Sequence, residues 1–548
     1  MNKALVCRLL GLVAMLIGGS MVFSLPWAWL APGAEWGHER AGFFGLVGSI
    51  LVCFAVAAGL RYLGRRNGGS LFRKEAMAVV GLSWVLATVL GGLPYVFSGT
   101  QWVEGRRMTL VDAMFEAQSG FSTTGATVLT DLEVPDGKPR PPLVARCILF
   151  WRSSTHFLGG LGIIVLFVAI LGQGSAGKAL MRAEMPGPSQ ATPQARVQHT
   201  AWVLFLIYAG LNAALTGLLW LEGVNLFDAL CHAFGTMATG GFSTYNASVG
   251  HFATRPDLYD GPLIEMTIAL FMLLAGTNFM LLYCLAILQP RKMLADIEWR
   301  VYLGVILVAA AMVTGFGLLT HDFGPQSGMV PPAASGETSD EEDDKLYVAT
   351  ATRYGLFQVV SIMTTTGFCT DDFDRWNSFG RGVLLLLMFV GGCAGSTGGG
   401  LKVIRHILFV KILHLEVEQA FHPTVVRPLR LAGKPVEDQE LRRTILVYFG
   451  MILAIFIVGW LFTITAEPDS TWIDYGHGQA EHKLIDAASC VAATLNNIGP
   501  GLGVIGATKN YANFQWYTKL LFIWLMMIGR LEIYVILVLF IPGFWRTQ

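Results

Sequence analysis

The chain has 548 residues, of which 53% are hydrophobic and 14% are charged, and its 38 basic residues balance its 38 acidic ones. In a soluble globular domain about 25% of the residues are charged, so this composition excludes an ordinary soluble protein. It predicts a polytopic membrane protein.

Long apolar runs recur along the whole chain. Ten of them are near or above the ~20 residues that a helix needs to cross a bilayer. They cover residues 4–31, 41–63, 76–98, 143–172, 200–221, 262–289, 300–319, 382–415, 444–466 and 516–541. Four further apolar runs are too short to span the membrane, and we expect them to form re-entrant half-helices.

The order of these runs predicts an all-α membrane protein built on an internal repeat. A transmembrane hairpin at residues 1–66 is expected to precede four pseudo-symmetric units around one pore. Each unit consists of a helix, a short pore helix, a polar stretch and a second helix. We assign the units to residues 67–175, 176–290, 291–430 and 431–548. The hairpin contains no polar stretch of this kind, so we expect it to pack against the units or to face lipid.

Basic residues gather on the side of the membrane that holds both termini. When the apolar runs are threaded back and forth, 22 of the 38 Lys and Arg residues fall there. The positive-inside rule therefore predicts that both termini are cytoplasmic and that the polar stretches open to the outside. The acidic insert at residues 339–344 also falls outside. We expect it to be a solvated loop, with a cation-attracting lip as the alternative.

Four polar stretches follow the short apolar runs, and we call them the filter stretches. Their sequences are STTGA at 122–126, MATGG at 237–241, TTTGF at 364–368 and NNIGP at 496–500. When the stretches are aligned on one glycine each, the glycines lie 115, 127 and 132 residues apart, at Gly125, Gly240, Gly367 and Gly499. This spacing indicates a repeat larger than any solenoid unit.

Three of the short apolar runs open with an Asp-Ala pair, at Asp112, Asp228 and Asp486. An Asp at a helix N-terminus binds free amide groups and suits the positive end of the helix dipole. We therefore expect each run to be a helix whose C-terminal carbonyl groups face the filter stretch, where they favour a cation. The third run has Arg353 and Tyr354 at this place, which leaves its start open.

Each filter stretch combines a glycine with polar neighbours. Glycine adopts backbone angles that other residues avoid. Successive carbonyl groups can then turn toward a common axis and replace the water around an ion, as in the TVGYG filters of potassium channels. A single stretch of this kind is more often a helix C-cap followed by a loop. Four stretches at matched positions in one chain favour a closed ring.

The run 382–415 is interrupted by a segment with six glycines in ten residues, which we call the glycine-rich segment (residues 391–400). Broken backbone at membrane depth is tolerated only where it lines a cavity or is buried in protein. We expect the segment to lie on the cytoplasmic side of the third filter stretch. A flexible plug is the functional interpretation, and a packing kink is the alternative.

Arg530 lies deep in the last apolar run, where an ionisable residue indicates a functional site. Glu532 is two residues further and projects from another face of the helix, so it is a poor partner. We expect Arg530 to point into the pore as a barrier to cations, to bind carbonyl groups that the glycine-rich segment frees, or to do both as a latch.

Three other motifs carry less weight. His232 lies within the second short apolar run, and we expect it to be a packing residue. The GxGxxG match at residues 501–506 follows a membrane half-helix instead of a strand, so it does not predict a dinucleotide site. No GxxxxGK[ST] or HExxH motif occurs. We expect no cofactor in this chain and no nucleic-acid partner.

Several motifs together resemble the TrkH family, the potassium-translocating subunits of bacterial Trk systems. They are ATGGFST at 238–244, TTTGF at 364–368, NNIGPGLG at 496–503, GSTGGGLKVIR at 395–405 and GRLEIYVILVLFIPGFWR at 529–546. The resemblance covers essentially the whole chain. It implies a homodimer in the bacterial inner membrane with one pore per subunit, and a cytoplasmic nucleotide-binding partner, TrkA, that controls opening.

The resemblance also implies roles for individual residues. Potassium binding is implied for Thr123, Thr124, Gly125, Ala238, Thr239, Gly240, Thr365, Thr366, Gly367, Asn497, Ile498 and Gly499. Gating is implied for Gly391, Gly392, Gly395, Ser396, Thr397, Gly398, Gly399, Gly400, Lys402 and Arg530. Relatives with serine at the first filter glycine tend toward sodium, so glycine in all four copies favours potassium. The insert at residues 325–345 is longer than in other members of the family, which leaves its role open.

These observations predict gated potassium uptake driven by the membrane potential, which is worth ~2.3 kcal/mol per charge per 100 mV. Symport of potassium with protons or sodium is the alternative. A membrane enzyme would need a catalytic set that faces a cavity, and the sequence contains no recognisable set of this kind.

Overall fold

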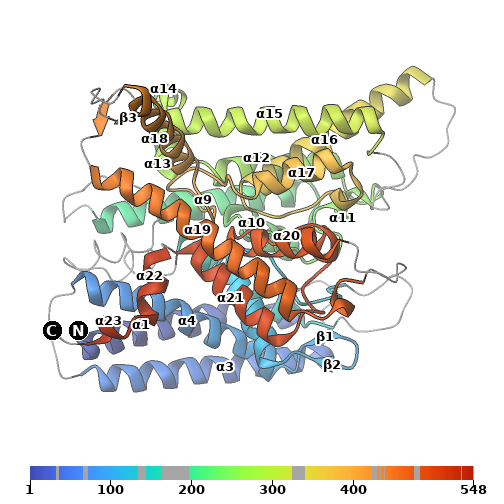
Figure 1. Cartoon of the computed structure of the whole chain (residues 1–548). Helices are drawn as coiled ribbons and strands as arrows, with labels where there is room; N and C mark the ends of the chain where they lie inside the picture. Colours follow the sequence, from blue (N-terminus) through green and yellow to red (C-terminus); the bar gives the residue numbers. More distant parts are fainter. Residues whose placement is uncertain are drawn as a thin grey trace.

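The structure, a computed structural model of the chain, describes residues 1–31, 36–65, 72–133, 143–162, 197–323, 340–422, 429–431, 434–436, 439–473, 482–531 and 533–546. Within these ranges the chain is almost entirely helical (Figure 1). Both termini lie at the same end of the molecule.

The helices fall into three groups by length. The longest are α1 (Lys3–Met21), α3 (Trp36–Leu63), α4 (Arg73–Phe97), α9 (Val197–Leu221), α15 (Ile297–Thr320), α16 (Asp340–Met363), α18 (Val403–Phe421) and α19 (Gln439–Ala466). Intermediate ones are α5 (Leu110–Phe121), α6 (Arg146–Leu161), α10 (Leu226–Met237), α12 (Gly261–Ala275), α13 (Phe279–Ala286), α17 (Ser378–Leu387), α20 (Lys483–Leu495) and α21 (Trp516–Arg530). The short ones are α2 (Trp27–Leu30), α11 (Gly250–Ala253), α14 (Pro290–Ala295), α22 (Ile533–Leu537) and α23 (Pro542–Trp545).

The described strands form two small antiparallel hairpins. β1 (Gln101–Val103) pairs with β2 (Arg106–Arg107), with Gln101 opposite Arg107. β3 (Leu429–Leu431) pairs with β4 (Lys434–Val436). The hairpins lie at opposite ends of the helical body (Figure 1), so neither enters its core.

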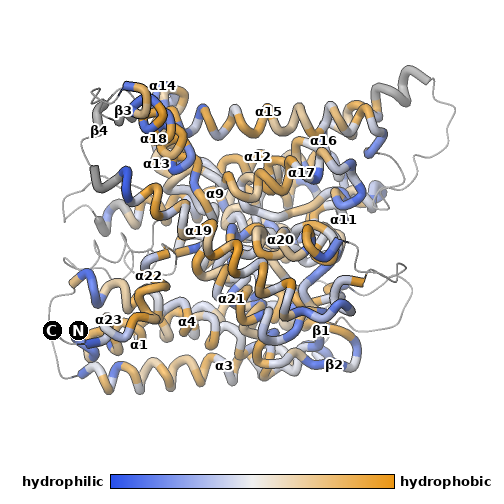
Figure 2. The backbone as a smooth tube through the Cα atoms, in the orientation of Figure 1, coloured by the Kyte–Doolittle hydropathy of each residue, from blue (hydrophilic) through white to orange (hydrophobic). Residues whose placement is uncertain are grey.

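Six helical segments of the described chain are long and apolar enough to cross a membrane. They are Lys3–Leu30, Trp36–Leu63, Arg73–Phe97, Ala201–Leu221, Ile297–Thr320 and Arg442–Ala466. The pair α12 and α13, which bends by 108°, makes a seventh if it is counted as one span. Figure 2 shows apolar residues along α3 and α15, which lie at opposite edges of the molecule in this view. The chain is a helical membrane protein.

Within the described residues the remaining predicted spans are shorter or broken. The run 382–415 breaks between α17 and α18, because glycine is a poor helix former and the glycine-rich segment contains six. The run 516–541 breaks between α21 and α22. The described part of the run 143–172 is α6, which ends at Leu161.

Four helices end directly at the filter stretches, namely α5, α10, α16 and α20. Three of them have 12 or 13 residues and carry the predicted Asp in the first turn. In α5, Thr109 and Asp112 form a capping box, which satisfies amide groups that no helical turn can reach. The predicted half-helices with their C-termini at the filter stretches are confirmed for these three.

The fourth, α16, differs from the expectation at its start. It has 24 residues and begins at Asp340, so residues 340–344 of the acidic insert form its first turns instead of a loop. Acidic side chains suit the positive end of a helix dipole, which is a physical reason for this start. Residues 324–339, the rest of the insert, lie outside the described ranges.

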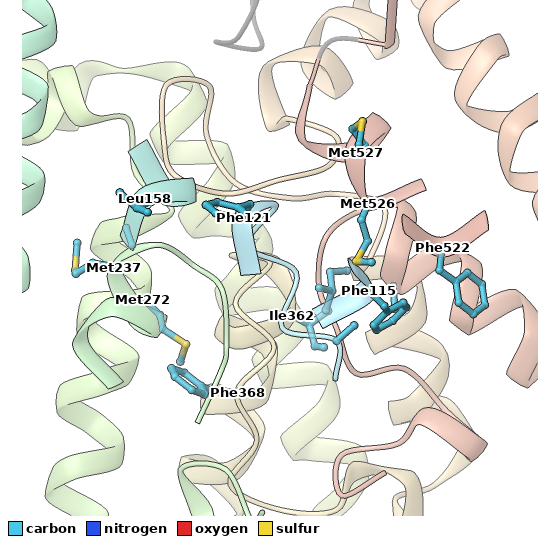
Figure 3. Close-up of a cluster of buried hydrophobic side chains, with 14 of the residues drawn as sticks. Phe115, Phe121, Leu158, Met237, Met272, Ile362, Phe368, Phe522, Met526 and Met527 are labelled. Atoms are coloured by element: carbon cyan, nitrogen blue, oxygen red, sulfur yellow. The ribbon is translucent and has the colours of Figure 1, made fainter. Parts of the chain in front are cut away.

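Buried apolar side chains surround the ends of these four helices. Figure 3 shows part of this buried apolar cluster, in which Phe115, Phe121, Met237, Ile362 and Met526 come from α5, α10, α16 and α21. None of these five side chains is exposed to solvent. The filter stretches are therefore held inside the molecule by packing from several units.

The N-terminal hairpin packs on the outside of this body. α1 and α3 contact each other closely, and both contact α4. α3 lies at the edge of the molecule, and its C-terminal end lies at the same end as both chain termini (Figure 1).

Candidate functional site

The four filter stretches share one backbone conformation. A non-glycine residue in each adopts a left-handed conformation, with φ of 53° at Thr123, 52° at Thr239, 61° at Thr365 and 56° at Asn497. The amide of the next residue donates to the carbonyl group five positions back, at 2.7 to 2.9 Å, in all four stretches. A left-handed conformation costs a non-glycine residue roughly 1–2 kcal/mol. Its occurrence at four matched positions indicates a geometry that the surrounding structure enforces.

This shared conformation corrects the predicted register of the second stretch. Positive φ recurs two residues after the left-handed residue, at Gly125, Gly367 and Gly499, and the corresponding residue in the second stretch is Gly241. Gly240 was therefore the wrong counterpart of Gly125. MATGG contains two adjacent glycines, and only the backbone angles distinguish them. The matched residues are Thr239, Gly240 and Gly241, and Ala238 ends the helix α10 as its C-cap.

The four stretches contact one another in a closed cycle, which we call the filter ring. A Cβ atom on the glycine of each stretch would collide with a carbonyl oxygen of the next. These pairs are Gly125 with Gly240, Gly241 with Thr366, Gly367 with Ile498 and Gly499 with Thr124. The fourth stretch thus meets the first, and the four carbonyl groups hold equivalent places in the ring.

The filter ring lies at the floor of a cavity of about 90 Å³. The glycines Gly125, Gly241, Gly367 and Gly499 all contribute to its lining. The threonines of the ring are fully buried, and Thr123 Oγ1 has no hydrogen-bond partner among the described residues. Backbone carbonyl and hydroxyl oxygens in this arrangement can replace the hydration shell of a cation.

A buried ion pair between Arg152 and Glu116 contacts the segments next to the filter ring. Arg152 of α6 donates to Glu116 of α5 at 2.7 Å and to the carbonyl of Ser243 at 2.9 Å, and its guanidinium lies 3.5 Å from the ring centroid of Phe242. Glu116 in turn accepts from the amide of Val128 at 3.0 Å. The pair therefore ties the segments that follow the first and second filter stretches. Sequence reasoning missed it, although charged residues beside apolar runs are the signal that reveals such sites.

Two further ion pairs join neighbouring units. Lys519 of α21 lies 2.7 Å from Asp112 of α5, which joins the fourth unit to the first. Arg353 of α16 lies 3.2 Å from Glu265 of α12, which joins the third unit to the second. Each pair joins a helix that follows one filter stretch to the helix that precedes the next filter stretch. The helix that precedes the filter stretch carries the acidic partner in the first pair and the basic partner in the second. The third unit has Tyr354 at the position where the other units carry an Asp, and Arg353 lies directly before it.

The glycine-rich segment lies directly against the filter ring. The amide of Gly399 donates to Thr365 Oγ1 at 2.9 Å, and a Cβ atom on Gly399 would lie 2.6 Å from the Cβ atom of Asn497. Lys402 is fully buried, and its ammonium group donates to the carbonyl of Gly398. Gly398, Gly399 and Gly400 therefore lie close to the third and fourth filter stretches.

The other half of the segment is anchored elsewhere. Gly391 and Gly392 pack against Leu401 and Gly276, and the carbonyl of Gly395 accepts from the amide of Phe279 at 3.0 Å. The hydroxyl of Ser396 donates to the carbonyl of Cys393 at 2.6 Å, within the segment itself. The contacts of Gly392 with Gly276 and of Gly395 with Phe279 hold this half of the segment at the bend between α12 and α13.

Glu298 of α15 joins the glycine-rich segment to the first turn of α18. Its carboxylate accepts from the amide of Ala394 at 2.7 Å and from that of Ile404 at 3.1 Å. Glu298 is 7% exposed, so these hydrogen bonds form away from water. Sequence reasoning missed this residue because it lies about a hundred positions earlier in the chain.

Arg530 joins the glycine-rich segment to the first unit. Its guanidinium donates to the carbonyl groups of Thr397, Gly159 and Gly160, the last at 2.8 Å. The side chain is 8% exposed. The expected hydrogen bond between Arg530 and a carbonyl group of the glycine-rich segment is therefore present.

His232 is a packing residue, as expected. It is fully buried, and its ring nitrogens hydrogen-bond with the carbonyl of Asp228 at 2.8 Å and the hydroxyl of Ser243 at 3.0 Å.

Comparison with known proteins gives a consistent family. Residues 46–546 match the TrkH family, described as a cation transport protein. The Trk system potassium uptake protein TrkH of Salmonella typhimurium is 37% identical over 549 residues, and the TrkH protein of Escherichia coli K12 is 35% identical over 552; both alignments cover 100% of each chain. The crystal structure of the potassium transporter TrkH from Vibrio parahaemolyticus superimposes with a TM-score of 0.78 at 30% identity and 100% coverage of both chains.

Proposed function

Because the chain belongs to the TrkH family of cation transport proteins, we propose that it takes up potassium ions across the bacterial inner membrane through the filter ring. It is a transport protein and not an enzyme. Potassium is the proposed cargo because the relatives at 37% and 35% identity are potassium uptake proteins.

The closed cycle of carbonyl contacts is the observation that carries this proposal. Four near-equivalent carbonyl groups, contributed by Thr124, Gly240, Thr366 and Ile498, form a set of oxygen ligands with fourfold pseudo-symmetry. The glycine that follows each of them leaves room for the next stretch. In this proposal, residues 67–548 form the four units around one pore, and residues 1–66 form the peripheral hairpin.

The glycine-rich segment and Arg530 are the proposed gate. The segment lies against Thr365 and Asn497 of the filter ring, and Arg530 bridges it to Gly159 and Gly160. A guanidinium group at this place would also repel an incoming cation. Opening then requires Arg530 or Thr397 to leave its present contact.

The working assembly is proposed by analogy to the Trk systems after which the relatives are named. It would be a homodimer with a cytoplasmic nucleotide-binding subunit similar to TrkA, both termini cytoplasmic and the filter ring open to the outside. Potassium is cargo, and no cofactor is proposed for this chain.

Reconstitution of the purified protein into liposomes tests the function. With an inward gradient, rubidium and potassium are expected to enter much faster than sodium, and addition of the nucleotide-binding partner is expected to change the rate. Equal sodium and potassium rates would contradict the filter ring as a potassium filter.

The same liposomes separate a channel from a symporter. A gated channel passes no net current at the potassium equilibrium potential, whatever the pH or sodium gradient. A shift of the reversal potential with either gradient would favour symport instead.

A further inference from the structure

The N-terminal hairpin, which the proposed ion pathway does not use, carries a basic pocket at the end of the molecule that holds both termini. The pocket has a volume of about 470 Å³ and is lined by Arg8, Ala58, Arg61, Tyr62, Gly64 and Arg65. Its described lining contains three arginines and no carboxylate. We propose that this pocket binds the phosphate headgroup of an anionic phospholipid.

The close approach of α1 and α3 builds the pocket. A Cβ atom on Gly64 would lie 2.7 Å from the carbonyl oxygen of Ala4 and 2.9 Å from Cβ of Arg8, so only glycine allows the end of α3 to come this near to α1. This approach places Arg8 beside Arg61 and Arg65, which come from the last turn of α3 and the residues just beyond it.

The charge of the pocket favours an anion. All three arginine side chains are exposed, and the guanidinium of Arg65 lies 5.4 Å from the ring centroid of Tyr62. The C-terminal carbonyl groups of α3 bring a partial negative charge, which the N-terminal end of α1 at the same place offsets. Planar guanidinium groups bind phosphate oxygens through paired hydrogen bonds.

The surface of α3 favours a lipid over a soluble phosphate. The pocket residues Ala58, Arg61, Tyr62 and Arg65 continue a stripe at helical spacing whose earlier members are Leu51, Phe54 and Ala55. Leu51 is 65% exposed and Phe54 is 42% exposed. The stripe is therefore apolar toward the middle of the membrane and basic at its end.

The length of the stripe fits an acyl chain. Leu51 and Arg61 are ten residues apart, and ten residues of α-helix rise about 15 Å, half of the ~30 Å hydrocarbon core. Tyr62, which is 69% exposed, stands at the level where aromatic residues anchor helices in the headgroup region. A phospholipid with its phosphate among the arginines would lay its chains along Phe54 and Leu51.

Native mass spectrometry of the full-length protein in detergent tests this proposal with phosphatidylglycerol and phosphatidylcholine as probes. The wild type is expected to retain phosphatidylglycerol and not phosphatidylcholine. The triple variant Arg8→Ala, Arg61→Ala, Arg65→Ala is expected to bind phosphatidylglycerol roughly a hundredfold more weakly, at about fivefold per arginine. The variant Arg291→Ala, Lys292→Ala removes two exposed basic residues elsewhere and is the matched control.

Two further measurements distinguish a lipid headgroup from free phosphate, and a third checks that the variants fold. Inorganic phosphate in large excess is expected not to displace the lipid, and Phe54→Gln is expected to weaken long-chain more than short-chain phosphatidylglycerol. Rubidium flux of the triple variant checks its fold; if it is lost, the single variant Arg65→Ala replaces it. Unchanged phosphatidylglycerol binding in the folded arginine variants, or displacement by inorganic phosphate, would overturn the proposal.

Discussion

The left-handed residues of the filter ring show how the site is enforced residue by residue. Thr123, Thr239, Thr365 and Asn497 all hold a conformation that glycine adopts more easily. The side chain of Asn497 donates to Thr124 Oγ1 at 2.9 Å and to the carbonyl of Met526 at 2.8 Å, so it fixes its own backbone against two elements. The cost of these left-handed conformations is tolerated because such contacts hold the backbone in place from several sides.

The corrected register makes Gly241→Ala more harmful than Gly240→Ala. A Cβ atom on Gly241 would meet the carbonyl oxygen of Thr366 and would be held at a φ of 77°, whereas a Cβ atom on Gly240 would meet the ring of His156. We expect Gly241→Ala to lower rubidium flux in liposomes at least ~5-fold, from a backbone cost of roughly 1–2 kcal/mol alone. The matched control is Gly240→Ala combined with His156→Ala, which provides room. Equal losses in the two variants would refute the register.

Arg530 is expected to hold the pore closed through its carbonyl partners. Arg530→Gln removes charge-assisted hydrogen bonds to Thr397, Gly159 and Gly160, each worth ~1.5–3 kcal/mol. Rubidium leak without the partner subunit should then rise ~10-fold or more. Arg530→Lys keeps the positive charge but loses the two separate NH₂ groups of the guanidinium. Its leak should therefore lie between that of the wild type and that of Arg530→Gln. A leak equal to wild type in both variants would remove Arg530 from the gate.

Residue types were easier to predict than residue contacts. The sequence marks Arg530 as unusual because it is a charge inside an apolar run, but its partners Gly159 and Gly160 lie about 370 positions away. The same holds for Glu116 and Arg152, whose pairing depends on how α5 and α6 pack. The second filter glycine was displaced by one position because composition cannot show the sign of φ.

At the scale of helices, the reversed ion pairs between units are expected to be structural clamps. Asp112→Ala leaves Lys519, which is 6% exposed, without its carboxylate partner. Loss of one partner of a buried pair costs ~3–5 kcal/mol, so the apparent Tm in detergent should fall clearly. The double variant Asp112→Lys, Lys519→Asp copies the polarity of Arg353 and Glu265 and should recover part of the loss.

An exposed ion pair supplies the control for this clamp. Asp469 pairs with Lys483 at 2.7 Å, but the side chain of Asp469 is 78% exposed. Exposed pairs contribute ~0–1 kcal/mol, so Asp469→Ala should change Tm little. A Tm of Asp112→Ala equal to that of Asp469→Ala would show that the buried pair is not a clamp.

A helix could be predicted from the sequence where an apolar run and an N-terminal capping residue indicate the same start. α5 and α10 follow from an Asp in the first turn and an apolar run of matching length. The break between α17 and α18 follows from the glycines. The start of α16 could not be predicted, because acidic residues suit a solvated loop and a helix N-terminus equally well.

For the whole molecule, the filter ring depends on contacts between residues far apart in the chain. Gly499 lies against Thr124 across about 375 positions, and these two residues close the cycle. Local sequence can therefore specify each stretch, while only the packing of all four units brings the carbonyl groups together. Small residues at the contacts are required because any Cβ atom there would displace a neighbouring carbonyl oxygen.

The orientation of the molecule can be tested at the cavity above the filter ring. Thr508 lines this cavity and is exposed, whereas Lys292 is exposed on α14, at the end that holds both termini (Figure 1). In a background with the eight native cysteines replaced, a membrane-impermeant maleimide should label Thr508→Cys in intact cells. It should label Lys292→Cys only after permeabilisation.

The same variant connects orientation with transport. A maleimide adduct on Thr508→Cys would fill much of a cavity of about 90 Å³. Labelling from outside is therefore expected to reduce rubidium uptake, while labelling of Lys292→Cys should leave the filter ring open. Modification of Thr508→Cys from the cytoplasmic side alone would reverse the proposed orientation. External labelling without loss of uptake would show that ions do not pass through this cavity, because an obstructed entrance must limit the flux that it carries.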